Sequence, residues 1–592
     1  MSPPRLSLRE RLESDLRMLR TSTKLAGAAK HRASSTTTVP DKWEAVVDKH
    51  PHKVAMIDAS DDGRAVTYLQ LDQMANRVAH WAKANELARG DVVALLMMNR
   101  PEYVATWLGL AKLGITSALI NTNLTGEPLR HSIEVSGARH IVVDEELADQ
   151  WQTSRGPEHP VELGFAPGWE EMAEHSTSRP KASERDGLTC GDRLLYIYTS
   201  GTTGLPKAAS FSHSKYLTVS LAAGAMTNID PSDRTYITLP LYHTAGGVMA
   251  LGGALLNGAT AVTVRKFSAS RFWDDCVQHR ATTFQYIGEL CRYLVNSPSH
   301  PLERAHGLRV ALGNGLRPDV WPEFQERFGI PDIVEFYGAT EGTGSLINLD
   351  NRVGAIGRMR PSVARRLGMH IVKYDVDADE IVRDANGHVI DVEPNEPGEF
   401  ISRISNVTPF EGYHDEEATE KKILRDAFRD GDAYFRSGDL LSQDEDGYYY
   451  FVDRIGDTFR WKGENVSTAE VAAVLGQATG VLEANVYGVT VPGADGRAGM
   501  ATLVVDDSFT TEALAAHAAE NLPAYARPLF LRIQTEVEIT GTFKHRKIDS
   551  VKEGFDPTAI DDPLWFFDPD DRAYVPLDPP LFARITAGEV RF

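Results

Sequence analysis

A ten-residue stretch in the first half of the chain concentrates hydroxyl groups, glycines and one lysine. It reads Tyr198-Thr-Ser-Gly-Thr-Thr-Gly-Leu-Pro-Lys207 and directly follows the apolar run Leu194–Tyr198. Glycine allows backbone N–H groups to approach phosphate oxygens, the hydroxyls donate further hydrogen bonds, and Lys207 supplies positive charge. The stretch is not a Walker loop, because it lacks Gly-Lys-Ser/Thr and Pro206 precedes the lysine. We predict a phosphate-binding loop, since a solvated turn does not account for this density of donors.

A second candidate site is Tyr337-Gly-Ala-Thr-Glu341, which follows the apolar run Ile333–Phe336. A carboxylate at a strand end beside a phosphate loop suits Mg²⁺, which keeps few protein ligands and shares the phosphate oxygens. Taken alone, Glu341 is typical of a solvated loop residue. Its interpretation as a metal ligand depends on the phosphate loop.

Two further segments carry weaker signals. Asp439, within Ser437–Leu440, and the pair Asp453-Arg454 could accept from and donate to the hydroxyls of a ribose. In isolation these segments are typical of a turn and a surface ion pair. The segment Thr540–Lys544 lies in a basic cluster that includes Lys547. A charge cluster is usually a solvated face, so Lys544 has no role on this ground alone.

Strand and helix patterns alternate around these segments, which indicates an α/β domain with a largely parallel sheet. Apolar residues at 71, 74, 75 and 78 predict one helix, and residues 102–113 a second. The predicted strands are Val54–Ile57, Val92–Met97, His140–Val143, Leu194–Tyr198, Thr235–Leu239, Ala261–Val264, Val310–Leu312 and Ile333–Phe336.

Beyond Pro397 the pattern changes to paired strands, with Gly447–Val452 expected opposite Asp457–Trp461. A small α+β unit is predicted from about Val466, with helices Thr468–Leu475 and Thr511–Leu522 and strands Glu483–Val489 and Met500–Val505. The fold class is therefore α/β: a large layered N-terminal domain, residues 41–453, joined by a hinge to a small α+β C-terminal domain, residues 454–592.

In this order the motifs resemble the superfamily of adenylate-forming enzymes, which includes acyl-CoA synthetases, firefly luciferase and the adenylation domains of peptide synthetases. The resemblance runs from about Trp43 to Lys547. It implies that ATP is the cofactor, with Mg²⁺ held by Glu341, and that Lys544, Thr340 and Glu341 are catalytic, Thr340 at the α-phosphate and Lys544 at the reacting carboxylate. The ATP-binding residues that it implies are Thr199, Ser200, Gly201, Thr202, Thr203, Gly204, Lys207, Gly313, Asn314, Gly315, Tyr337, Gly338, Ala339, Asp439 and Arg454. Of these, Gly313–Gly315 and Tyr337 would flank the adenine.

A narrower resemblance is to the fatty acid transport protein and very-long-chain acyl-CoA synthetase family. It rests on Asp453–Val466, the Thr-Gly-Thr-Phe-Lys motif, Tyr286–Tyr293 and Tyr574–Leu577. The resemblance implies coenzyme A as co-substrate, with Trp461, Lys462 and Gly463 as CoA-binding residues. Two positions depart from the wider superfamily, Gly456 at the hinge and Phe543 before the lysine. The first leaves the hinge mechanics open, and the second keeps Lys544 in register.

The acyl pocket should be apolar and deep. Tyr242–Met249 begins with polar rings and continues with small or aliphatic residues, and Gln285–Leu290 is expected to follow another strand. The acyl-binding residues are predicted to be Tyr242, His243, Val248, Ile287 and Gly288. The alternative, that both segments are ordinary core, stays open.

Composition narrows the classes of partner. The 592 residues carry 62 Lys and Arg against 83 Asp and Glu, a net charge of -21, which disfavours nucleic acid as a partner. Three cysteines without CxxC spacing argue against a zinc site or a disulfide framework and favour a reducing compartment. The uncharged stretch Thr244–Val264 is interrupted by glycines, so we predict a buried helix, a turn at Asn257-Gly258 and a strand rather than a membrane span.

The first 40 residues differ from the rest. Ser7 and Glu10 predict a helix start, a basic amphipathic helix follows, and Ala33–Pro40 resembles a flexible linker. The helix could lie on an anionic membrane or dock on its own domain, and the sequence favours neither. No signal peptide is predicted, so we expect a cytoplasmic protein, with peripheral contact to the inner face of a membrane left open.

The two resemblances together imply an enzyme that ligates a long- or very-long-chain fatty acid to coenzyme A through an acyl adenylate. Two alternatives remain: an acyl-AMP ligase that serves a carrier protein, and a fatty-acid uptake protein coupled to acyl activation. Chain length, and whether the acid is a fatty acid, a bile acid or a carnitine-like acid, stay open.

Overall fold

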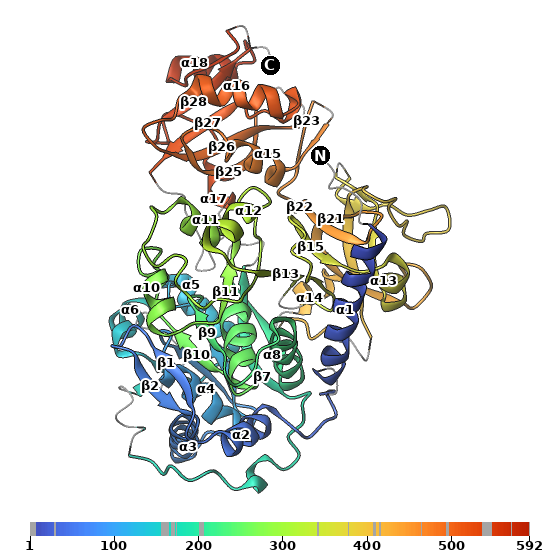
Figure 1. Ribbon diagram of the computed structural model, residues 1–592. Helices are drawn as coiled ribbons and strands as arrows, with labels where there is room; N and C mark the ends of the chain where they lie inside the picture. Colours follow the sequence, from blue (N-terminus) through green and yellow to red (C-terminus); the bar gives the residue numbers. More distant parts are fainter. Residues whose placement is uncertain are drawn as a thin grey trace. The chain divides into compact units, whose positions relative to one another are not determined.

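The structure is a computed structural model that describes residues 7–28, 31–155, 165–166, 172, 174–200, 206–339, 342–376, 378–405, 410–413, 416–462, 464–492, 496–535, 547–569 and 571–590. The chain forms two compact units (Figure 1). Unit 1 contains residues 1–316, 323–352 and 404–423, and unit 2 contains residues 317–322, 353–403 and 424–592.

Unit 1 is built on two largely parallel sheets. The larger has eight strands in the order β14-β13-β12-β11-β9-β10-β1-β2, all parallel except β14 and β2 at its edges. Its strands are β1 (Val54–Asp58), β2 (Arg64–Thr67), β9 (Arg234–Ile237), β10 (Thr260–Thr263), β11 (Thr283–Ile287), β12 (Val310–Asn314), β13 (Asp332–Gly338) and β14 (Ser345–Asn348).

The second sheet has six strands in the order β6-β5-β3-β4-β7-β8, with only β8 antiparallel to its neighbour. Its strands are β3 (Val92–Leu96), β4 (Thr116–Leu119), β5 (His140–Val143), β6 (Phe165–Ala166), β7 (Arg193–Ser200) and β8 (Pro206–Ser212). The predicted α/β class is confirmed; the strands missing from the prediction include the short β4 and the seven-residue β8.

Helices cover these sheets. In α3, Thr67 and Gln70 form a capping box, and Leu71, Ala75 and Val78 are fully buried, as the periodicity predicts. The described helices of this part of the chain are α1 (Leu8–Ala28), α2 (Val39–Lys49), α3 (Tyr68–Ala84), α4 (Pro101–Ala111), α5 (Gly126–Ser136), α6 (Ala148–Ser154), α8 (His213–Thr227), α9 (Leu251–Leu255), α10 (Phe272–Gln278), α11 (Gly288–Asn296), α12 (Trp321–Phe328) and α14 (Glu416–Glu420), with short 3₁₀ turns at Glu145–Leu147 and Ala182–Arg185.

The uncharged stretch from Thr244 forms a π-helix, η3 (Thr244–Ala250), then α9 and β10. The prediction of a buried helix, a turn and a strand is confirmed. Glycine is required in η3 because a Cβ on Gly247 would lie 2.0 Å from the carbonyl oxygen of Leu241. Among the described residues, no helix has the length and apolar character needed to cross a membrane.

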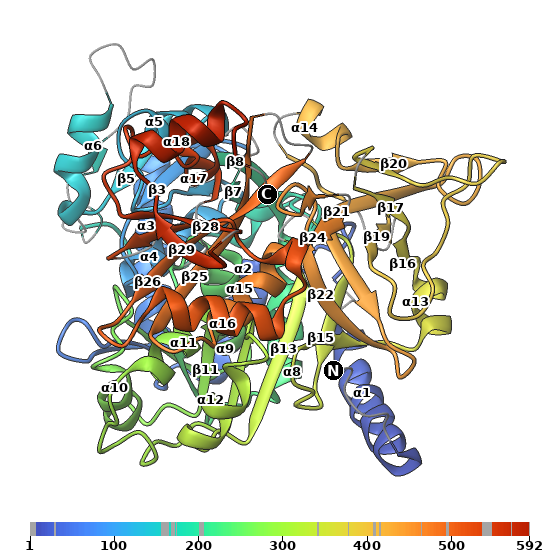
Figure 2. The same cartoon turned by 90° about the horizontal axis from the view of Figure 1, so that it is seen from above.

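The N-terminal segment is tied to unit 1. Ser7 and Glu10 form the predicted capping box, with the Ser7 N–H donating to Glu10 at 2.7 Å. Figure 2 shows α1 beside α8, with which it packs. The interpretation of residues 33–40 as a flexible linker does not describe this segment, because the carbonyls of Ala33 and Ser35 accept from Gly191 and Cys190 at 2.7 Å and α2 begins at Val39.

Unit 2 contains an antiparallel sheet, a five-stranded mixed sheet and two hairpins. The antiparallel sheet is β15 (Ala355–Arg358), β22 (Tyr448–Arg454), β21 (Ala433–Gln443), β19 (Gly398–Arg403) and β16 (Met369–Val372), with β20 (Ile423–Arg425) on β21. The hairpins are β17 (Tyr374–Asp375) with β18 (Glu380–Ile381), and β23 (Phe459–Trp461) with β24 (Glu464–Val466). The predicted pairing of Gly447–Val452 with Asp457–Trp461 is wrong, because β22 pairs with β21 and β15 while β23 turns back on β24.

The mixed sheet runs β25 (Val481–Thr490), β26 (Arg497–Val505), β27 (Phe530–Gln534), β28 (Leu564–Asp568) and β29 (Ala573–Pro576). The helices α15 (Thr468–Leu475) and α16 (Thr511–Asn521) contact each other and pack on it, which confirms the predicted small α+β part. The remaining helices of unit 2 are α13 (Pro361–Leu367), α17 (Lys547–Glu553) and α18 (Pro579–Thr586), and a 3₁₀ turn spans Ala524–Ala526.

Candidate active site

The carboxyl ends of β11, β12 and β13 bring predicted site residues to one edge of the large sheet. These strands are parallel neighbours, so the chain leaves each of them on the same side. Ile287 pairs with Asn314, and Gly313 pairs with Glu335 two residues before Tyr337. The structure therefore collects at this edge residues that were predicted separately to bind acid and nucleotide: Ile287, Gly288, Gly313, Asn314, Gly315, Tyr337, Gly338 and Ala339.

The buried carboxyl group of Glu335 fixes the loop at this edge, and none of the sequence motifs indicated it. Glu335 of β13 is 2% exposed and accepts from the N–H groups of Gly315 and, at 3.2 Å, Leu316. It also accepts from the hydroxyl of Tyr286 at 2.5 Å. Burial raises the pKa of Glu335 to about 8, although these donors oppose the shift. The available signal was an acidic residue inside an otherwise apolar strand.

Gly288 begins α11 in close contact with this clamped loop. A Cβ on Gly288 would lie 1.7 Å from the carbonyl oxygen of Gly315, and Gly315 itself has a φ of +78°. Any side chain at residue 288 would therefore displace the loop rather than fill an acyl groove. The interpretation of Gln285–Leu290 as a segment after a strand also needs correction, because β11 extends to Ile287 and only Gly288 onward is helical.

The predicted phosphate loop lies between two paired strands. Thr199 and Ser200 end β7, and Lys207 lies opposite Thr199 on β8, with its ammonium 5.7 Å from the ring centroid of Tyr413. The hydroxyl of Tyr198 donates a hydrogen bond to the backbone carbonyl of Ser132, which holds β7 in place. The loop residues Gly201, Thr202, Thr203 and Gly204, and also Thr340 and Glu341, lie outside the described residues.

Two of the acyl candidates in and before η3, Tyr242 and Val248, pack in the main apolar core of unit 1. Tyr242 is buried, and its hydroxyl accepts from Asn123 at 3.5 Å, while its ring contacts that of His243 at 4.5 Å. Met249, the neighbour of Val248, instead packs with Leu312 and Val334 against the large sheet.

In unit 2 the predicted ribose pair is brought together by strand register. Asp439 of β21 lies opposite Arg454 of β22, and the Arg454 Nε is 3.7 Å from the Asp439 carboxylate. The arginine side chain is half exposed, so its guanidinium group has room to turn toward a ligand.

The start of the C-terminal part is held by a second buried carboxylate. Asp453 is 2% exposed and accepts from the N–H of Thr468 at 2.6 Å. Lys547 donates to the Thr468 hydroxyl at 2.7 Å and pairs with Asp457 at 3.1 Å. The expectation that Lys547 is a solvated charge is therefore wrong. Lys544 lies outside the described residues.

The predicted CoA segment lies on the β23–β24 hairpin. Trp461 is 3% exposed and packs in the core of the C-terminal part. Lys462 occupies the turn with a φ of +54°, and Gly463 lies outside the described residues. Their role in binding CoA stays a prediction.

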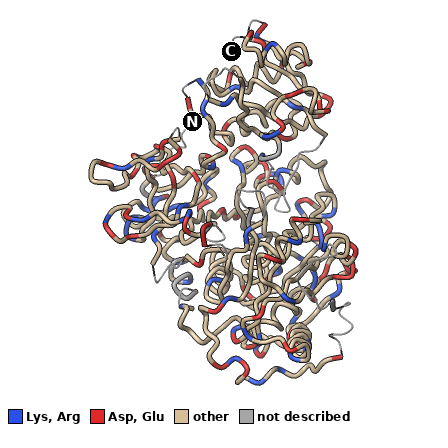
Figure 3. The backbone as a smooth tube through the Cα atoms, turned by 180° about the vertical axis from the view of Figure 1, so that it is seen from behind, with Lys and Arg blue, Asp and Glu red and all other residues tan. Residues whose placement is uncertain are grey.

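Charge is mixed along the described chain, with acidic and basic positions interspersed (Figure 3). At the strand-end edge, Glu335 accepts from the N–H groups of Gly315 and Leu316, and burial raises the pKa of its carboxyl group. An edge of this kind, with apolar residues such as Ile287, suits the apolar end of a substrate.

Comparison with known proteins agrees with this organisation. Residues 43–414 match the family model described as AMP-binding enzyme, and residues 470–544 match that of the AMP-binding enzyme C-terminal domain. Long-chain fatty acid transport protein 1 of Mus musculus is 43% identical over 577 residues, which are 95% of this chain and 89% of the mouse protein. Long-chain fatty acid transport protein 2 of Rattus norvegicus is 44% identical, covering 91% of this chain and 88% of the rat protein.

The fold has a counterpart among solved structures. An anthranilate CoA ligase in complex with anthranoyl-AMP superposes with a TM-score of 0.74 at 23% identity, covering 88% of this chain and 98% of the ligase. The resemblance to adenylate-forming enzymes, and the fold class it implied, are confirmed. The chain therefore belongs to the AMP-binding enzyme family, as an AMP-forming acyl-CoA ligase related to the long-chain fatty acid transport proteins.

Proposed function

We propose that this enzyme activates a long-chain fatty acid with ATP and transfers the acyl group to coenzyme A. The observation that carries the proposal is the convergence of the predicted adenine and acyl residues at the carboxyl ends of β11, β12 and β13. The name of the mouse relative, a long-chain fatty acid transport protein, supports a fatty acid as the substrate.

In the first half-reaction a carboxylate oxygen of the acid attacks the α-phosphorus of ATP. A bond to the acyl oxygen forms, the bond to pyrophosphate breaks, and an acyl adenylate results. Two anions must approach each other, so positioning and neutralisation supply most of the acceleration. Lys207 and Lys544 are proposed to offset this charge, and Mg²⁺ at Glu341 would neutralise the phosphates.

In the second half-reaction the thiol of coenzyme A attacks the acyl carbonyl carbon and AMP leaves. No nucleophilic side chain of the protein is required. Of the cysteines, Cys276 and Cys291 are fully buried, and burial raises the pKa of each thiol well above its ordinary value, so neither is suited to act as a nucleophile.

The test is AMP and thioester formation with a panel of saturated acids. We expect AMP release that depends on both the acid and coenzyme A, with kcat/KM rising as methylenes are added, because each buried methylene contributes about 0.8 kcal/mol. Release of acyl adenylate without thioester would favour a ligase serving a carrier protein. Fatty-acid uptake that persists in a variant without ligase activity would favour the transport alternative.

We also propose that α1 contacts an anionic membrane surface. Leu12, Leu16 and Leu19 lie on one face and are 55%, 52% and 61% exposed. The helix contacts unit 1 through polar residues instead: Ser14 is 6% exposed and hydrogen-bonds Asp350, and the exposed Arg17 donates to the carbonyl of Leu349 at 3.1 Å. A helix that docks only to complete its own domain would bury its leucines, so this face is available for a lipid surface.

Charge favours an anionic surface, because α1 carries five basic and three acidic residues in a protein of net charge -21. Changing Leu12, Leu16 and Leu19 together to serine should reduce cosedimentation with anionic vesicles and leave turnover of a short, soluble acid intact. Leu367→Ser, at a leucine that is 57% exposed in unit 2, is the control. Unchanged vesicle binding in the triple variant would refute the contact.

A further inference from the structure

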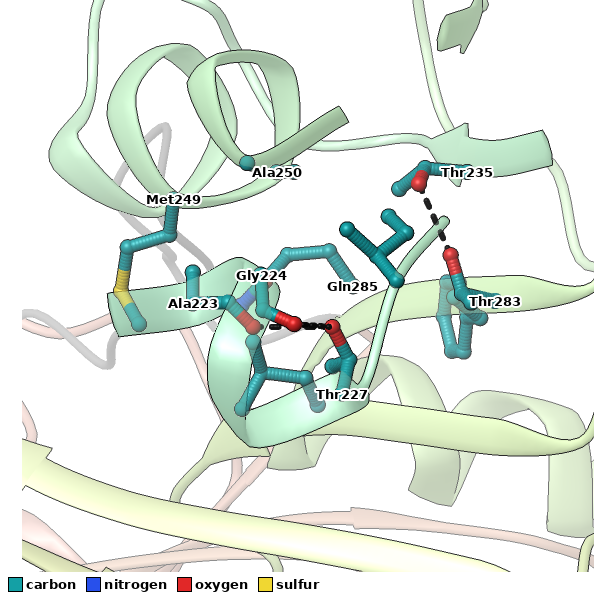
Figure 4. Close-up of a pocket in the computed structure, with 12 residues that line it drawn as sticks. Ala223, Gly224, Thr227, Thr235, Met249, Ala250, Thr283 and Gln285 are labelled. Atoms are coloured by element: carbon teal, nitrogen blue, oxygen red, sulfur yellow. Dashed lines mark hydrogen bonds between the residues drawn. The ribbon is translucent and has the colours of Figure 1, made fainter. Parts of the chain in front are cut away.

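A small cavity lies between the large sheet and the helices that cover it. Figure 4 shows its lining, in which β9, β11 and β12 form one wall and α8, η3 and α9 the other. Its volume is about 20 Å³. Because one water needs roughly 10–15 Å³ measured in this way, the cavity has room for a single oxygen-sized group.

Gln285 is the polar residue of this cavity whose hydrogen bonds are not accounted for. It is 1% exposed, and neither its Nε2 nor its Oε1 has a hydrogen-bond partner among the described residues. The nearby hydroxyls are used differently, since Thr227 donates to the carbonyl of Ala223 at 2.8 Å and Thr283 donates to Thr235 at 2.8 Å (Figure 4). A buried amide without partners is costly, so the cavity is built to receive a hydrogen-bonding group.

Strand β11 relates the cavity to the proposed acyl site. Gln285 and Ile287 are two residues apart on β11, so they share one face of the sheet and lie about 6.6 Å apart along the strand. Met249 also lines the cavity, whereas its neighbour Val248 packs into the main apolar core of unit 1. A chain that passes Ile287 and continues inward therefore meets Gln285.

We propose that Gln285 binds a hydroxyl oxygen in this cavity, belonging either to a resident water or to a hydroxylated acyl chain, and thereby determines acyl specificity at the deep end of the site. The proposal rests on the acyl-binding role assigned above. A plain alkyl chain that reached the cavity would leave the amide buried without partners, whereas a chain hydroxyl would satisfy it.

Gln285→Met tests this directly, because methionine has a similar length and lacks both hydrogen-bonding groups. kcat/KM is measured by AMP release for saturated acids of increasing length and for mid-chain hydroxy acids of matched length. If Gln285 binds a resident water, kcat/KM of Gln285→Met rises about tenfold for acids that are long enough to reach the cavity and is unchanged for shorter acids. If Gln285 binds a chain hydroxyl, the parent prefers one hydroxy acid by about tenfold and the variant loses that preference.

Thr227→Val is the matched control, since it lines the same cavity but its hydroxyl already has an acceptor within α8. Its relative kcat/KM values across the panel of acids should equal those of the parent. Turnover of a short acid reports that each variant is folded. An unchanged relative profile in Gln285→Met, or the same change in Thr227→Val, would overturn the assignment of Gln285. Absence of AMP release by the parent with every acid would instead refute the proposed function.

Discussion

Glu335 and Asp453 are two buried carboxylates that perform the same task in different electrostatic surroundings. Glu335 lies in the middle of β13 and Asp453 near the end of β22, each is 2% exposed, and each accepts from the backbone N–H of a segment that it fixes in place. The partners of Glu335 are neutral, and burial raises its pKa to about 8. Burial also raises the pKa of Asp453, but Lys547 opposes that shift.

The difference shows how the two units hold their functional segments. In unit 1 the Gly313–Leu316 loop is held by an acid that can be protonated at neutral pH. In unit 2 the segment from Asp453 to Thr468 is held by charge, through Lys547 and Asp457. Substitutions that remove a charge or an acceptor should therefore affect the two regions differently.

The largest effect is expected for Lys544→Ala. Its proposed role is to offset charge as the carboxylate meets the α-phosphate, and removing one such contact costs about a hundred- to a thousand-fold in rate. Pyrophosphate release from acid plus ATP should therefore nearly cease, while a supplied acyl adenylate and coenzyme A should still give thioester at close to the parent rate.

The control for this variant is Lys552→Ala, an exposed lysine in the last turn of α17, because Lys547 is engaged. It should change neither half-reaction. Equal loss of both halves in Lys544→Ala would show that the catalytic lysine has been misassigned.

Next in size is Glu335→Ala. It leaves the N–H groups of Gly315 and Leu316 and the Tyr286 hydroxyl without their acceptor, so we expect the free energy of unfolding to fall by about 3 kcal/mol. The KM for ATP should rise, because the loop was predicted to flank adenine. Denaturant titration and steady-state kinetics measure the two effects.

Glu335→Gln tests the comparison through the pH dependence of stability, because it removes the titratable carboxyl group. Because the folded-state pKa of Glu335 is raised from 4.5 to about 8, the native protein binds the extra proton in this range. Its contribution to stability is therefore present at low pH and declines as pH rises toward 8, by at most about 1.4 kcal/mol per pH unit. The glutamine variant should lack this slope and retain an acceptor for both N–H groups. If Glu335→Gln kept the same slope of stability against pH, the titrating group would be a residue other than Glu335.

A smaller effect is expected for Lys547→Met. Loss of the bond to Thr468 and of the pair with Asp457 should lower the free energy of unfolding by about 1 kcal/mol, because the pair is only partly buried. The pKa of Asp453 should rise further without the ammonium nearby. Lys552→Met should stay within about 0.5 kcal/mol of the parent, and an equal loss in both variants would contradict the contact.

The smallest change in stability should come from Asp439→Asn. Arg454 is half exposed and 3.7 Å away, and such pairs contribute about 0–1 kcal/mol. If Asp439 binds ribose, the KM for ATP should nevertheless rise about tenfold. Loss of stability without a change in KM would make the pair structural.

The sequence by itself determined the α/β class, the family resemblance and most of the strands. Hydrophobic periodicity is local, so Val54–Ile57 and Thr468–Leu475 could be predicted from their own residues. The parallel pattern also implied that motifs after successive strands would meet at one edge, as Ile287, Gly313 and Tyr337 do.

Other features depend on which segments become neighbours, and only the tertiary structure decided them. Gly447–Val452 was expected opposite Asp457–Trp461, but β22 pairs instead with β21, its neighbour in the chain, and with β15, which is far from it in sequence. The same holds for the outward leucines of α1, for the pairing of Lys547 with Asp457 and for the buried amide of Gln285. The physical reason is that burial and electrostatic environment are properties of the packed neighbours of a residue, which its local sequence pattern does not specify.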